Sequence, residues 1–192
     1  MSDLKPYPLF SNAIRTHDLT ALDELLVKFP EILAFRVPGF GTWLHYAAAH
    51  GNLEIVKFLV QQGFDINAPD DHFGIAPLEA ACSKGNVEIA RYLIDQGAVM
   101  DVSESVRNPL WSAVVGRSPE IAQMLLDAGI DTSPRYKLTD AVDEDLDAVA
   151  FAVLRGESEI AHLVALWNSG GNEAQAQAAI AEGLRIAEAI TE

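Results

Sequence analysis

Residues 42–56 read TWLHYAAAHGNLEIV, and residues 76–90 read APLEAACSKGNVEIA. The second segment repeats the first after 34 positions, so that Leu44 is matched by Leu78 and Gly51 by Gly85. A third copy begins 32 positions further on, with Asn108-Pro109-Leu110. Self-similarity at such a period predicts stacked repeat units, each of which is one small supersecondary element.

Two weaker copies flank the three clear ones. Shifted back by 34 positions, Phe10 matches Leu44; shifted forward by 39 from the third copy, Val149 matches Leu110. The sequence therefore predicts about five repeats and a C-terminal helix. The predicted boundaries are 9–37 and 145–167 for the weaker repeats, 38–71, 72–105 and 106–137 for the clear ones, all within an array over 1–167, and 168–192 for the helix.

The repeated segment resembles the ankyrin-repeat family, whose units of about 33 residues carry the signature Thr-Pro-Leu-His-x-Ala. The first clear copy departs from it at Trp43, the second at Ala76 and Glu79, and the third at Asn108 and Trp111. The resemblance covers about residues 9–167. It implies an all-α solenoid of helix-turn-helix units, with turn or hairpin fingers between them and a concave binding surface formed by the fingers and the first helices.

Each unit is predicted to contain two short antiparallel helices. In the first clear copy these run over about residues 42–50 and 53–61, with Gly51 and Gly63 ending them because glycine adopts the left-handed backbone without strain. The second helix places apolar residues on one face, which no unit buries alone, so that stability is expected to come from stacking between neighbours.

The last stretch, residues 172–190, does not match the repeat and predicts a capping helix. Asn172 is the expected N-cap residue. Ile180, Leu184 and Ala187 share one face, which we expect to cover the end of the array.

The chain is acidic, with a formal net charge of −15 over 192 residues and an apolar fraction of 49%. This charge repels nucleic-acid phosphates and anionic membrane surfaces. No signal-peptide pattern and no apolar run long enough to span a bilayer is present in the sequence. We therefore expect a cytoplasmic protein whose partner is another protein, with no nucleic acid and no membrane involved. The negative charge is compatible with a basic partner.

No catalytic, metal or cofactor motif is found in the sequence. His45 stands at the signature histidine position, where a structural role in the turn is expected, and Cys82, the single cysteine, is expected to be a buried thiol in a first helix. The acidic residues of 140–147 lack the glycine and the closing glutamate of a calcium loop and predict a solvated connection. The interpretation is a non-enzymatic chain with no cofactor and no metal.

We therefore predict a protein–protein interaction module, acting as an adaptor, inhibitor or regulator through its concave face. The alternatives are a self-associating structural subunit and, less favoured, a small-ligand binder or enzyme that uses the concave groove; a monomer is favoured. Contact residues are expected at finger and first-helix positions that the fold does not require, the alternative for each being a side chain folded onto its own turn. They are Phe40, Ala49, His50, His72, Phe73, Ile75, Ser83, Lys84, Glu104, Arg107, Val115, Leu146 and Arg155.

Overall fold

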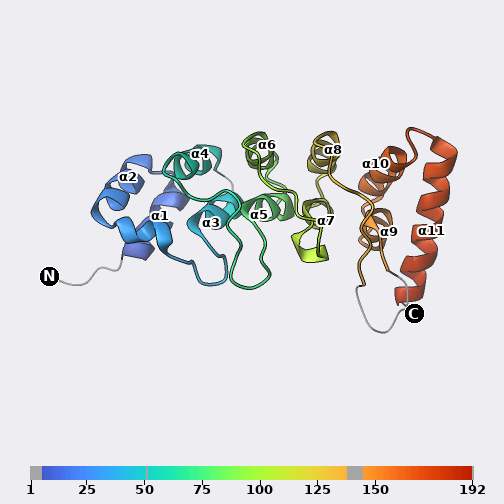
Figure 1. The fold of residues 1–192 in the computed structure, drawn as a ribbon, viewed down its shortest axis with the longest axis horizontal. Coiled ribbons are helices and arrows are strands. Elements are labelled where there is room, and N and C mark those ends of the chain that lie inside the picture. Colours follow the sequence, from blue (N-terminus) through green and yellow to red (C-terminus); the bar gives the residue numbers. More distant parts are fainter. Residues whose placement is uncertain (1–5, 51, 138–144, 192) are drawn as a thin grey trace.

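Helix pairs follow one another along the chain in a computed structural model, which describes residues 6–50, 52–137 and 145–191. The described residues form α1 (Pro6–Thr16), α2 (Leu19–Lys28), α3 (Trp43–His50), α4 (Leu53–Gln61), α5 (Pro77–Ser83), α6 (Val87–Asp95), α7 (Pro109–Val115), α8 (Pro119–Asp127), α9 (Ala148–Leu154), α10 (Ser158–Asn168) and α11 (Glu173–Thr191), with short 3₁₀ turns η1 (Pro30–Ala34) and η2 (Ser105–Arg107). Figure 1 shows α1, α3, α5, α7 and α9 as one layer of an elongated stack and the even-numbered helices as the other. The predicted all-α repeat fold is confirmed.

The second helix of the first clear copy begins and ends where the sequence predicts. Asn52 caps α4, its side-chain oxygen accepting from the Ile55 N–H at 2.8 Å. At the other end Gly63 has a φ of 90°, and the Phe64 N–H reaches back to the Leu59 carbonyl at 3.1 Å. That conformation would strain any residue with a Cβ, so the glycine sets where α4 ends and the next finger starts. Gly51 lies outside the described residues.

The core is one continuous cluster between the two layers. The matched leucines Leu44, Leu78 and Leu110 are fully buried, as are Leu59 and Leu93 of the second helices. The cluster runs through all the units, and the first helices contact those of the neighbouring units, so the stability gained by burial is expected to be shared along the stack.

Small residues let the first helices approach each other closely. At Gly116, just after α7, a Cβ atom would lie 2.1 Å from the Cys82 carbonyl oxygen of α5. Only glycine allows this approach. Cys82 itself is fully buried, as expected, and burial raises the pKa of its thiol.

The C-terminal helix α11 lies across the end of the stack, beside α9 and α10 (Figure 1). Asn172 caps it as predicted, accepting from the Gln175 N–H at 3.1 Å. Of the predicted face, Ile180 is half-buried against the core, but Leu184 is 50% exposed. The buried residues of α11 are Ala176, Gly183 and Ile186.

Helix α11 packs closely on α9 at Gly183. A Cβ at this glycine would lie 3.2 Å from the Ala150 Cα of α9, so a small residue is needed here, and Ile186, three residues further on, shares the buried face. The predicted repeat boundaries remain a prediction from the sequence.

None of the helices in the described residues combines the length and apolarity needed to cross a membrane.

Candidate functional site

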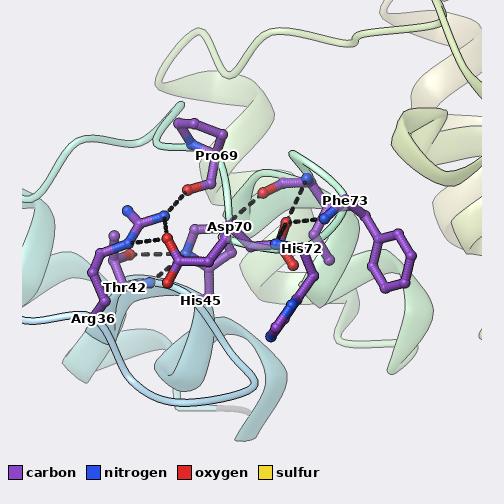
Figure 2. Close-up of polar contacts among 9 residues, drawn as sticks. Arg36, Thr42, His45, Pro69, Asp70, His72 and Phe73 are labelled. Carbon is purple, nitrogen blue, oxygen red and sulfur yellow. Dashed lines mark hydrogen bonds and ion pairs between the residues drawn. The ribbon is translucent and has the colours of Figure 1, made fainter.

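The finger between α4 and α5 is a tight turn organised by one carboxylate. Oδ1 of Asp70 accepts from the backbone N–H groups of His72 (3.3 Å), Phe73 (2.8 Å) and Ile75 (3.2 Å), and the Asp70 N–H donates to the Ile75 carbonyl at 2.8 Å. Figure 2 shows the Phe73 ring pointing away from this network. The turn thus holds an exposed aromatic ring on an ordered backbone.

His45 ties this finger to the preceding unit. Its Nδ1 accepts from the Thr42 N–H at 3.1 Å, so Nε2 carries the proton and donates to the Ile75 carbonyl at 2.9 Å (Figure 2). Burial lowers the pKa of His45 and favours the neutral ring that this arrangement needs. The predicted structural role of His45 is confirmed.

An exposed ion pair makes a second link between the two units. Arg36 lies 2.7 Å from the Asp71 carboxylate and also donates to the Pro69 carbonyl (Figure 2). Hydrogen bonding to Arg36 holds the pKa of Asp71 below its usual range. Both side chains are exposed, so the pair positions the finger more than it stabilises the fold.

An apolar groove of about 330 Å³ opens beside this finger. Its lining comes from the finger, η2, α5, α7 and α9, which belong to consecutive units. The residues that line it are Phe73, Ile75, Glu79, Ser83, Ser105, Val106, Trp111, Ser112, Val115 and Phe151, and we call this set the groove. Two of these residues, Trp111 and Phe151, stack on each other with ring centroids 4.0 Å apart and planes at 7°.

The groove lies where the signature histidine is replaced. Glu79 occupies in its repeat the position of His45, but Oε2 of Glu79 accepts from the Ala76 N–H at 2.8 Å and so closes its own turn. Among the described residues, the link from His45 to the next finger has no counterpart at Glu79. Burial raises the pKa of Glu79 to about 7.

The next finger is held from within instead. Arg107 lies 3.3 Å from Asp101 and 3.0 Å from Glu104, and donates to the Ser103 hydroxyl at 2.9 Å. The charge of Arg107 is therefore balanced by acidic side chains of its own finger, beside the groove.

Four of the predicted contact residues lie together in the groove, namely Phe73, Ile75, Ser83 and Val115. Phe73 is 63% exposed and Val115 is 46% exposed, so apolar surface is open to a partner. Lys84 and His72 are exposed next to groove residues in the sequence, and Arg107 and Glu104 form the ion pair described above.

Phe40 and His50 lie instead in an aromatic cluster around Tyr46. The Tyr46 and His50 rings stack at 4.0 Å, and Phe40 meets Tyr46 edge-on at 5.2 Å. His50 also contacts the Tyr46 carbonyl at 2.7 Å through Nδ1. Ala49 is half-buried in the same helix and Arg155 is exposed after α9.

Leu146 is a correction, because it is 1% exposed and belongs to the core. An antiparallel bridge to Tyr136, with N–H···O distances of 2.9 and 3.0 Å, turns the Leu146 side chain inward. The repeat pattern predicts a finger position for Leu146, but the direction of its side chain depends on the bridge to Tyr136, which the pattern does not contain.

The groove also contains six residues that were not among the predicted contact residues: Glu79, Ser105, Val106, Trp111, Ser112 and Phe151. The sequence does mark two of them, because Glu79 and Trp111 replace the signature histidine. A replacement at this position removes the histidine that bonds a unit to the finger of the next one.

The described residues hold no group of three or more His, Cys, Asp or Glu side chains placed to bind a metal ion. Asp140, Asp143 and Glu144 of the predicted acidic connection lie outside the described residues.

Stacked helix pairs, with a signature histidine that bonds one unit to the finger of the next, define a helical repeat protein. The family model of ankyrin repeats in three copies matches residues 3–70 and 44–136, and the chain belongs to this family. It is also similar to the human protein phosphatase 1 regulatory subunit 27, with 42% identity over 75 residues. That match covers 39% of this chain and 48% of the relative, so the chain spans about half the length of that protein.

Proposed function

We propose that this chain is a non-catalytic protein-binding module that regulates or recruits a partner through the groove and the Phe73 finger. The observation that carries the proposal is the groove itself, an open apolar site lined by several consecutive units. Membership of the ankyrin-repeat family and the similarity to a phosphatase regulatory subunit support an interaction role.

The energetics of the site favour binding. Phe73 and Val115 expose apolar surface that a partner can remove from water, and aromatic side chains at such places dominate interface energies. Because Asp70 already orders the finger, little backbone entropy is lost when a partner docks.

The test is capture from native lysate followed by quantitative mass spectrometry, with two matched double variants. Phe73→Asp with Val115→Asp places two charges in the groove, and Val27→Asp with Leu184→Asp places the same charges on exposed apolar residues at the two ends of the stack. We expect the groove variant to lose the proteins that the wild type and the end variant retain. Loss from the end variant alone would contradict the proposal.

One partner can be tested at once. The relative's name makes protein phosphatase 1 the first candidate, and calorimetric titration of the purified phosphatase into this chain would detect binding. Absence of binding would set this partner aside, whereas the capture experiment tests the module itself.

Self-association is the second candidate function, favoured by the exposed Leu184 and Trp167 near the C-terminal end of the stack. Light scattering on the purified chain distinguishes self-association from our expectation of a monomer.

A cytoplasmic location is likewise a proposal, for which fractionation of cells is the direct test.

A further inference from the structure

The groove combines an apolar lining with a single acidic side chain. Glu79 is 2% exposed, yet it lines the groove together with Phe73, Val106 and Val115, which carry no charge. The next finger adds Asp101, whose charge acts on Glu79, and the exposed Glu104.

Neighbouring positive charge does not neutralise Glu79. Arg107, the cation of the next finger, is engaged by Asp101 and Glu104. The charge interactions of His45 in α3 are with Arg36, Asp70 and Asp71.

The other residues that line the groove are uncharged. α7 contributes Trp111, Ser112 and Val115 to the lining, and the buried Cys82 thiol of α5 stays protonated because burial raises its pKa. A ligand cation is therefore the group that would complement this acid.

The size of the groove limits what enters it. About 330 Å³ is at the lower end of the range of small-ligand sites, roughly 300–1,000 Å³. This is room for one large side chain and its neighbours, and an extended segment laid along several units suits it better than a whole helix.

We propose, on the basis of the proposed function, that the groove binds an extended segment of a partner protein. In this segment one large apolar side chain is adjacent to a lysine or an arginine. The apolar side chain packs between Phe73, Val106 and Val115, and the cation faces the Glu79 carboxylate. The net charge of −15 favours the approach of such a basic segment over a long range.

Binding of this kind depends on pH in a defined direction. With a pKa of about 7, Glu79 is largely protonated at pH 6 and largely ionised at pH 8. A cation gains more from the ionised acid, so affinity rises with pH between these values. For a purely apolar ligand the order is reversed, because the protonated acid is easier to desolvate.

Three synthetic probes test the proposal on the full chain: acetyl-Ala-Lys-Phe-Lys-Ala-amide, the same peptide with both lysines replaced by glutamine, and the same peptide with phenylalanine replaced by serine. Binding is measured by NMR titration, with the indole N–H of Trp111 as the reporter in the groove. At pH 8 we expect the Lys-Phe-Lys peptide to bind about tenfold more tightly than either other peptide, and the difference between the Lys and Gln peptides to shrink at pH 6.

Two variants locate the effect. Glu79→Gln is expected to remove both the preference for lysine and its pH dependence, whereas Glu88→Gln, an exposed acid on α6, is expected to leave both unchanged. Thermal melts verify that each variant is folded.

Three results would overturn the proposed ligand chemistry. They are equal affinity for the Lys and Gln peptides, an unchanged preference for lysine in the Glu79→Gln variant, and no binding of any of the three peptides. The proposed function would still stand if capture depended on Phe73 and Val115. It fails separately if capture does not depend on them.

Discussion

Replacing Glu79 by glutamine is expected to stabilise the protein above neutral pH. The pKa of Glu79 rises from its ordinary value of 4.5 to about 7 in the folded chain, because burial penalises the charged form. The folded state thus binds a proton more tightly than the unfolded state does. Stability is therefore higher below pH 4.5 and falls as pH rises towards 7.

The size of the effect follows from the shift. At about 1.4 kcal/mol for each pH unit, the change from 4.5 to about 7 corresponds to about 3 kcal/mol of unfolding free energy. Most of this is lost between pH 5 and pH 8. Glutamine has a side-chain oxygen that can still accept from the Ala76 N–H and carries no charge, so its contribution does not change over this range.

The assay is urea unfolding of wild type and Glu79→Gln at pH 5 and at pH 8, followed by far-ultraviolet circular dichroism. The comparison between the two proteins at each pH cancels the titration of all other groups. We expect the variant to gain about 2–3 kcal/mol on the wild type between pH 5 and pH 8. The same difference between the two proteins at both pH values would refute the reasoning, since it would mean that Glu79 does not change its protonation on folding.

The remaining predictions concern packing and the finger. Leu93→Ala, at a fully buried central position, is expected to cost about 2–5 kcal/mol in urea unfolding, and Leu25→Ala, half-buried in α2, clearly less; equal losses would argue against a stacked array. Gly116→Ala is expected to cost about 1–3 kcal/mol because its Cβ meets the Cys82 carbonyl, and an unchanged thermal midpoint would contradict this close approach. Asp70→Ala is expected to speed hydrogen exchange at the Phe73 amide with little change in the exchange of core amides; an unaltered rate at Phe73 would show that the carboxylate does not order the finger.

The repeat could be predicted from the sequence because its anchors perform the same task in every unit. Leu44, Leu78 and Leu110 are all fully buried, and His45 makes the turn contacts expected of the signature histidine. The burial and contacts of such residues depend on neighbours that recur at a fixed spacing, so the periodicity of the sequence is enough to predict them.

Only part of the groove can be predicted from the sequence. Phe73 and Val115 are apolar residues at positions that the fold does not require, whereas Trp111 and Phe151 have the sequence pattern of core residues, and only the structure shows that they also line the groove. Leu146 and Leu184 were misplaced for the opposite reason, since bridge geometry and close helix packing decide their exposure and neither follows a repeat.

The measurement that tests the central claim most directly is the affinity of a purified captured partner for three forms of the chain. Calorimetry would compare the wild type, the groove variant with Phe73→Asp and Val115→Asp, and the end variant with Val27→Asp and Leu184→Asp. Because a central aromatic side chain that acts as a hot spot contributes about 2 kcal/mol or more, loss of the Phe73 contact alone is expected to make the groove variant bind at least about thirtyfold more weakly, and the end variant is expected to bind within about twofold of the wild type. Equal affinity of the wild type and the groove variant would contradict the claim that this protein works through its groove.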